Sequence, residues 1–188
     1  MPPADIMLMR HGEKPVAHGV APFGVTADGV QCVHSLTPRG WQRAGALIAL
    51  FLVKNGRPSE LPMPTNLVAP DYGDATFKHR SYQTLLPLSV RLATPIQIPA
   101  DVGSEEKAAR KLLAMSGSVL VCWEHGRLSR IAEQLPLKSS DQLPDSWDDD
   151  RFDLLWWFSL SHSTDEYSFT LVHQELLSGD TLAHSAGA

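Results

Sequence analysis

The stretch Ile6-Met7-Leu8-Met9-Arg10-His11-Gly12-Glu13 decides the fold of this 188-residue chain. It opens with a short continuous apolar run, which is typical of a strand buried on both faces of a parallel sheet. The stretch Val119-Leu120-Val121-Cys122-Trp123-Glu124-His125-Gly126 repeats the pattern far along the chain. Ligands of open α/β sheets bind beyond the carboxyl ends of such strands. We therefore expect His11 and His125 to face one crevice.

The rest of the chain alternates between helix-like and strand-like segments. Helices are expected from the N-cap Thr37 to a stop at Asn55-Gly56, over residues 82–92, after the N-cap Ser104 and over residues 128–135. Further strands are expected over residues 66–69 and 96–98, and an antiparallel hairpin over 154–158 and 167–172. The sequence therefore predicts one domain over residues 1–188. Its class is α/β, a three-layer α/β/α sandwich with a mainly parallel sheet and an antiparallel C-terminal hairpin.

Composition narrows the functional class. The 16 basic and 21 acidic residues give a net charge of −5, which argues against non-specific nucleic-acid binding. No apolar run approaches the length that crosses a bilayer. The two cysteines lack the spacing of a redox or zinc motif, and the histidines outside the two junctions lack ligand-like spacing. We expect a cytoplasmic protein with no metal site, no cofactor, and no nucleic-acid or membrane partner; the sequence leaves its oligomeric state open.

The residues at the two junctions favour phosphoryl chemistry. A neutral histidine is a nucleophile that can carry a phosphoryl group. Arginine binds phosphate oxygens bidentately and keeps its charge. Arg10 adjoins His11, and Arg80 begins the helix after the second strand, where the helix N-terminus adds a further anion-binding element. Together these residues predict a phosphate pocket at the crevice.

Four segments in order carry a family resemblance. They are Met9-Arg10-His11-Gly12-Glu13-Lys14, Leu36-Thr37-Pro38-Arg39-Gly40, Arg80 with Gln83-Thr84, and Glu124-His125-Gly126. This ordered set resembles the histidine phosphatase superfamily, which includes phosphoglycerate mutases and small phosphohistidine phosphatases. The resemblance implies a phosphoglycerate mutase-like fold without a large cap domain. It also implies a metal-independent phosphatase in which His11 is transiently phosphorylated and Arg10, Arg80 and His125 complete the phosphate pocket.

The proton donor to the leaving group is the open question. The chain departs from the family pattern here, because Gly126 rather than an acidic residue follows His125. Glu124 precedes that histidine, although adjacent residues on a strand point to opposite faces. The competing carboxylates are Asp101, Glu105 and Glu13. A second departure is the segment Lys78-His79-Arg80-Ser81, whose neighbours of Arg80 are less typical of the family.

Three functions are open at this point. The first is hydrolysis of a phosphorylated small molecule or phosphoprotein through phospho-His11. The others are a phosphoglycerate mutase-like phosphotransferase and a catalytically silent module that binds a phosphorylated ligand. Residues 15–35 are expected to form a long loop and the only candidate lid. The acidic residues 145–153 are expected to form a solvated turn, and Glu105 a solvated charge in the first turn of a helix.

Overall fold

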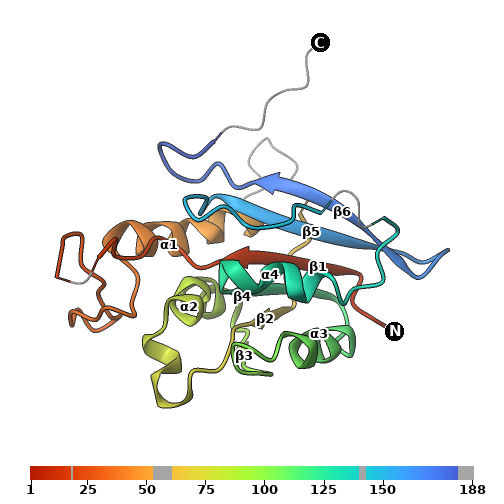
Figure 1. The fold of residues 1–188 in the computed structure, drawn as a ribbon, viewed down its shortest axis with the longest axis horizontal. Coiled ribbons are helices and arrows are strands. Elements are labelled where there is room, and N and C mark those ends of the chain that lie inside the picture. The colour runs from red at the N-terminus through yellow and green to blue at the C-terminus, as the bar shows by residue number, and fades with distance from the viewer. Residues whose placement is uncertain (18, 53–60, 140–142, 182–188) are drawn as a thin grey trace, which may run out of the picture.

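A computed structural model describes residues 1–17, 19–52, 61–139 and 143–181 (Figure 1). Its strands are β1 (Asp5–Arg10), β2 (Asn66–Val68), β3 (Ile96–Gln97), β4 (Ser118–Trp123), β5 (Leu154–Ser161) and β6 (Glu166–His173). They form one sheet in the order β3-β2-β4-β1-β5-β6. The first four strands are parallel, whereas β5 pairs antiparallel with β1 and β6 antiparallel with β5. The predicted α/β class, mainly parallel sheet and C-terminal hairpin are confirmed.

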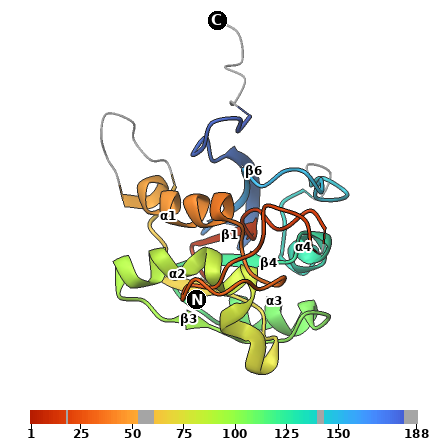
Figure 2. The same cartoon turned by 90° about the vertical axis from the view of Figure 1, so that its left-hand side faces the viewer.

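Helices cover both faces of this sheet. They are α1 (Pro38–Leu52), α2 (Arg80–Leu92), α3 (Glu105–Leu113) and α4 (His125–Ala132), with a 3₁₀ helix η1 (Gly73–Lys78) between β2 and α2. Helices α1 and α2 pack together on one face, and α3 and α4 on the other (Figure 2). No helix in the described ranges has the length and apolarity needed to span a bilayer.

Strand β1 explains why the opening apolar run is continuous. Ile6 and Leu8 join the core beneath α3 and α4, whereas Met7 and Met9 join the core beneath α1 and α2. All four side chains are fully buried. Because successive side chains of a strand point to opposite faces, a strand covered on both faces needs an apolar residue at every position.

The helix starts agree with the sequence at α1 and α3, which begin directly after Thr37 and Ser104, and differ at α2 and α4. Thr37 caps α1 as predicted, since its Oγ1 accepts a hydrogen bond from the Gly40 N–H at 3.2 Å. The stop expected at Asn55-Gly56 lies outside the described residues. Helix α4 begins at His125 rather than at residue 128, and α2 begins at Arg80 rather than at residue 82. Apolar periodicity does not detect a polar first turn, whose N–H groups have no partners inside the helix.

Candidate active site

The two histidine junctions meet at one edge of the sheet. Strands β1 and β4 are parallel neighbours, and their last residues Arg10 and Trp123 are paired in register. The residues that follow therefore emerge side by side. The imidazole rings of His11 and His125 have their centroids 6.5 Å apart and their planes at 89°. The expectation that the two histidines lie together beyond the ends of these strands is confirmed.

His11 is held in a defined tautomer. Its side chain is 4% exposed, and its Nδ1 lies 2.7 Å from the carbonyl oxygen of Gly12. A carbonyl only accepts hydrogen bonds, so Nδ1 carries the proton and Nε2 does not. Burial, assisted by the nearby charges of Arg80 and Arg10, holds the pKa of His11 well below its usual range despite the bond to Gly12. The ring is thus neutral and presents an unprotonated Nε2, which is the nucleophilic form.

Arg10 is anchored on one side and unpartnered on the other. Its Nη1 donates to the carbonyl oxygens of Asp148, Asp149 and Arg151 at 3.3, 2.5 and 3.4 Å. The guanidinium carbon lies 3.9 Å from the centre of the Phe152 ring. The buried Nε and Nη2 have no hydrogen-bond partner among the described residues. Burial lowers the pKa of Arg10 to about 10, so the group stays charged at neutral pH.

Arg80 stands at the first position of α2 and approaches the same edge. Its Nη1 donates to the carbonyl oxygen of Val33 at 3.0 Å, and its buried Nε has no partner in the described part of the chain. Thr84 joins this turn to the β1 junction. Its hydroxyl donates to the Arg80 carbonyl at 2.7 Å and accepts from the Gly12 N–H at 2.9 Å. The segment that holds His11 and the segment that holds Arg80 are therefore bonded directly to each other.

Gln83, in the first turn of α2, has a structural role. Its Oε1 accepts from the Leu36 N–H at 2.9 Å, and its Nε2 donates to Ser35 Oγ at 3.0 Å. These bonds fasten the end of the loop over residues 15–35 to α2. The loop itself has no helix or paired strand among its described residues, only turns and the isolated bridge Val25–Gln31.

Glu124 and His125 diverge although they are adjacent. Glu124 has extended backbone angles, φ −71° and ψ 129°, and its Oε1 accepts a hydrogen bond from the Tyr72 hydroxyl at 2.9 Å. His125 turns the other way, and its Nε2 lies 2.5 Å from Asp149 Oδ1. This divergence follows from the alternation expected of extended residues. It places Glu124 on the side of η1 and α2, where its charge raises the pKa of Arg80 against the larger lowering by burial.

Of the competing carboxylates, Glu13 is engaged in ion pairs and Asp101 lies at the surface. Glu13 accepts from Arg43 Nη2 at 2.8 Å and from Arg39 Nε at 3.2 Å. Arg43, only 2% exposed, also pairs with Asp180 at 2.7 Å, so Glu13 belongs to an ion-pair network that ties the β1 junction to the C-terminal segment. Asp101 is exposed in the turn before α3.

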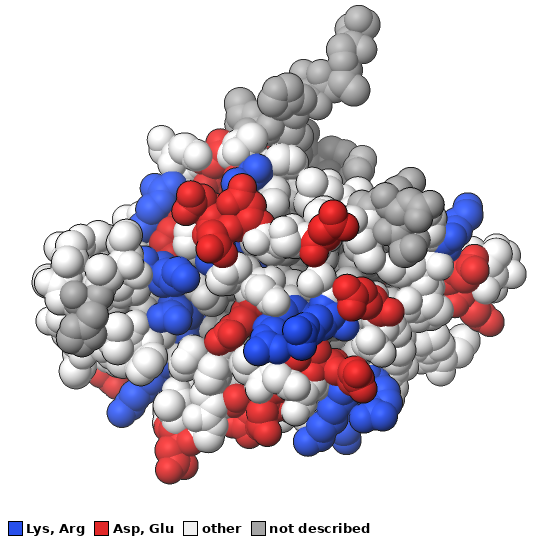
Figure 3. Space-filling model, viewed as in Figure 1, with Lys and Arg blue, Asp and Glu red and all other residues white. Residues whose placement is uncertain are grey.

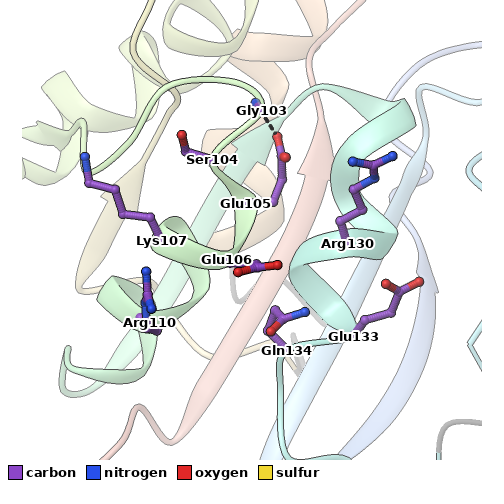
Figure 4. Close-up of a pocket in the computed structure, with 9 residues that line it drawn as sticks. All are labelled: Gly103, Ser104, Glu105, Glu106, Lys107, Arg110, Arg130, Glu133 and Gln134. Atoms are coloured by element: carbon purple, nitrogen blue, oxygen red, sulfur yellow. Dashed lines mark hydrogen bonds between the residues drawn. The ribbon is translucent and has the colours of Figure 1, made fainter.

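Glu105 is not the solvated charge that the sequence predicts. It is 3% exposed and accepts from the Gly103 N–H at 2.8 Å and from Trp123 Nε1 at 3.2 Å. It lines a cavity of about 490 Å³ between α3 and α4, together with mixed acidic and basic side chains (Figure 4). Acidic and basic groups are likewise interspersed over this whole face (Figure 3). The expected Ser104 side-chain cap is also not formed, since Glu105 bonds the turn instead.

The prediction of a solvated turn over residues 145–153 holds for its acidic side chains Asp145, Asp148, Asp149 and Asp150, which are exposed, but it misses the buried residues of the segment and its contact with Arg10. Trp147 and Asp153 are each 5% exposed, and Phe152 lies on Arg10. The prediction is based on the acidic side chains. The segment contacts Arg10 through backbone carbonyls, which any residue type would supply and which therefore have no sequence signature. The aromatic residues within the acidic run are the signal that could have identified it. Tyr72 was missed too, although it follows β2 at the same edge of the sheet.

Neither a metal-binding geometry in the described residues nor a sequence relative gives further evidence of function. The described residues contain no group of three or more His, Cys, Asp or Glu side chains that could hold a metal ion. No protein-family model matches the chain, and a search of curated proteins gives no significant match. A functional assignment therefore depends on the geometry of the residues themselves.

Proposed function

We propose that this protein is a phosphatase that hydrolyses a phosphomonoester or a protein phosphohistidine through a phospho-His11 intermediate. One observation carries the proposal. Six buried side-chain nitrogen or oxygen atoms lack a hydrogen-bond partner among the described residues, and four of them belong to Arg10, Arg80 and His125. These are three of the residues that the ordered sequence motifs assign to a phosphate pocket.

The unpartnered edge of Arg10 supports an anionic ligand. A buried polar group without a partner costs about 1–3 kcal/mol, and more when it is charged. In arginine, Nε–H and Nη2–H point the same way and form one of the forks that bind two phosphate oxygens. Phe152 and the three carbonyls hold the rest of the guanidinium, so this fork has a fixed direction. A phosphoryl group would satisfy it, and the orphaned nitrogens of Arg80 and His125 would serve the remaining oxygens.

For a phosphomonoester substrate, the first step of the proposed reaction forms the intermediate. Nε2 of neutral His11 attacks phosphorus in line with the leaving oxygen. The P–N bond forms as the bond from phosphorus to the leaving oxygen breaks. Arg10, Arg80 and protonated His125 neutralise the charge on the three equatorial oxygens. Protonated Glu124 gives its proton to the leaving oxygen, so that an alcohol departs.

The second step releases phosphate. A water molecule attacks phosphorus, and the Glu124 carboxylate accepts its proton. The P–N bond breaks, and Nε2 of His11 returns to its neutral, unprotonated state. Two observations support Glu124 in this role: the Tyr72 hydroxyl donates a hydrogen bond to its Oε1, and the charge of Glu124 raises the pKa of Arg80. Its Oε2 makes no hydrogen bond within the described residues, and that oxygen would carry the proton.

The test measures the turnover of two substrates, 4-nitrophenyl phosphate and a phosphohistidine peptide, by wild type, His11→Ala and His162→Ala. His162 is an exposed histidine in the turn between β5 and β6 and is the matched control. We expect turnover by wild type and His162→Ala, and a loss of at least about 10³-fold in His11→Ala. Unchanged turnover in His11→Ala would refute the mechanism.

Two further results would replace the proposal by its alternatives. Transfer of the phosphoryl group to a second phosphorylated substrate instead of water would identify a mutase-like phosphotransferase. Phosphate binding by a wild-type protein that turns over no substrate would identify a silent binding module. The arginines and His125 suffice for such a module, whereas hydrolysis also needs His11 and an acid.

A further inference from the structure

The contact between His125 and Asp149 is not explained by the reaction above. Asp149 Oδ1 lies 2.5 Å from His125 Nε2. A carboxylate accepts hydrogen bonds, so Nε2 carries a proton whenever this contact is formed. The other ring nitrogen, Nδ1, is buried and has no partner among the described residues. The Asp149 side chain is 82% exposed and that of His125 22%, so the carboxylate lies outside and the ring inside.

We propose that Asp149 is a positioning residue that orients His125 and favours protonation of its imidazole, so that Nδ1–H donates to the phosphoryl group. This inference rests on the proposed function of the pocket. It assigns a second task to the acidic segment, whose carbonyls already hold Arg10. Asp149 thus contacts two of the three cationic groups of the proposed pocket: its carbonyl oxygen accepts a hydrogen bond from Arg10 Nη1, and its carboxylate binds His125.

The segment that carries Asp149 is fixed to the protein core. Trp147 packs on Trp156, with ring centroids 5.1 Å apart, and its Nε1 donates to the Arg151 carbonyl at 2.8 Å. The Arg151 guanidinium in turn pairs with buried Asp153 at 2.8 Å. Trp147 precedes Asp149 in the chain, and Arg151 and Asp153 follow it, so the backbone is held on both sides of Asp149. Its carboxylate is therefore presented to His125 from an anchored backbone.

The charges around His125 explain why a carboxylate is needed there. Burial, and then Arg10 at the end of β1, lower the pKa of His125, and Lys14 lowers it further. Asp149, from the segment before β5, is the group that raises it, and the net direction is downward. Without Asp149 the ring would be neutral over a wider pH range. A neutral ring protonated on Nε2 would turn the lone pair of Nδ1 toward the phosphate oxygens, which repels them.

The experiment compares Asp149→Asn with Asp150→Asn. The side-chain amide oxygen introduced by Asp149→Asn still accepts a hydrogen bond, but the charge is gone; Asp150 is the exposed neighbour and loses the same charge. His125 must be protonated to act, so activity falls as pH rises through its pKa. Loss of a charge that favours protonation lowers this pKa. We expect the alkaline limb of kcat/KM to move to lower pH by about one unit in Asp149→Asn and to stay in place in Asp150→Asn.

A second readout does not depend on turnover. NMR titration of the His125 Cε1–H signal should give a lower pKa in Asp149→Asn than in wild type, and no change in Asp150→Asn. An equal pKa in Asp149→Asn and wild type would overturn the inference, as would a loss of activity by the same factor at every pH. Absence of phosphorylated His11 in wild type would instead overturn the proposed function, and the titration would still decide the role of Asp149.

Discussion

The junctions after β1 and after β4 have the same sequence pattern but are supported in different ways. After β1, the backbone is packed closely: a side-chain carbon placed on Gly12 would lie 2.9 Å from the Gly40 carbonyl oxygen. The Gly12 N–H is bonded to Thr84, and Glu13 is held by Arg43. After β4, a carbon placed on Gly126 would meet no atom within 4 Å. Glu124 and His125 are held by single side chains, Tyr72 and Asp149.

This difference distinguishes His11, the proposed nucleophile, from Glu124 and His125, the groups proposed to assist it. His11 is oriented by the backbone carbonyl of the next residue and is nearly inaccessible to solvent. Its position therefore depends on the core of the sheet. Glu124 and His125 depend on residues that are distant in the chain, and His125 is partly exposed. We expect substitutions at the first junction to affect stability and activity together, and substitutions of Glu124 or His125 to affect activity alone.

The largest expected effect in this comparison is that of Glu124→Gln on substrates with poor leaving groups. An alkyl phosphate needs a proton on its leaving oxygen, and general acid catalysis contributes about 10²–10⁴-fold. We expect kcat to fall by about 10²-fold with an alkyl phosphate and by less than about 10-fold with 4-nitrophenyl phosphate, because nitrophenolate leaves without a proton. Steady-state kinetics with both substrates measures the two ratios.

Glu13→Gln is the matched control for this prediction. Glu13 follows the first junction and is bonded to Arg43 and Arg39, so its replacement should not distinguish between the two leaving groups. An equal loss on both substrates in Glu124→Gln would contradict the role of Glu124 as the proton donor. A leaving-group dependence confined to Glu13→Gln would transfer that role to the first junction.

The second effect is a contrast between Gly12→Ala and Gly126→Ala. At Gly12 the added methyl group meets backbone atoms that cannot swing away, and such overpacking costs about 1–3 kcal/mol. Gly126 lies in open space in the first turn of α4, where alanine is neutral or stabilises by up to about 1 kcal/mol. Urea denaturation should show a lower free energy of unfolding for Gly12→Ala only. Equal losses in both variants would mean that the two junctions are packed alike.

The third effect is similar in size to the second and concerns the ion-pair network behind the first junction. Burial would raise the pKa of Asp180, but hydrogen bonds from Arg43 and from the Leu177 N–H outweigh it and lower the pKa to about 2. A carboxyl group with a lowered pKa stabilises the fold above its unfolded pKa of about 3.9, and this contribution is lost as pH falls through about 2. Asp180→Asn should lower the free energy of unfolding at pH 7 by about 1–3 kcal/mol.

The same substitution should flatten the dependence of stability on pH between about pH 4 and pH 2. Asp165→Asn, in the exposed turn between β5 and β6, is the control and should leave both quantities unchanged. Thermal unfolding at a series of pH values measures them. An acid dependence in Asp180→Asn as steep as in wild type would show that other carboxylates govern acid unfolding.

The sequence is most informative where side-chain type and strand alternation carry the signal. The apolar runs of β1 and β4 predict strands of a parallel sheet whose carboxyl ends face one crevice, and the observed pairing of the two strands brings His11 and His125 together. The divergence of Glu124 from His125 follows from the same alternation. Arg80 is recognisable from its place at the start of α2.

Other parts of the site have no such signal. The acidic segment supports Arg10 through backbone carbonyls, so any residue type at those positions would give the same contact. Asp149 reaches His125 only because Trp147 and Phe152 bring the segment to the sheet edge. Glu105 is buried because Trp123 and the Gly103 N–H satisfy its carboxylate, and that pairing depends on the tertiary packing of α3 against β4.

Identification of the phosphorylated atom during turnover tests the central proposal most directly. Wild type is mixed with substrate, quenched in alkali within milliseconds, and digested for mass spectrometry and ³¹P NMR. Because Nδ1 of His11 donates to the Gly12 carbonyl, the phosphoryl group should be found on Nε2 of His11, as an acid-labile and alkali-stable adduct that is absent from His11→Ala. A phosphoryl group on Nδ1, on another residue, or on none during active turnover would contradict the account.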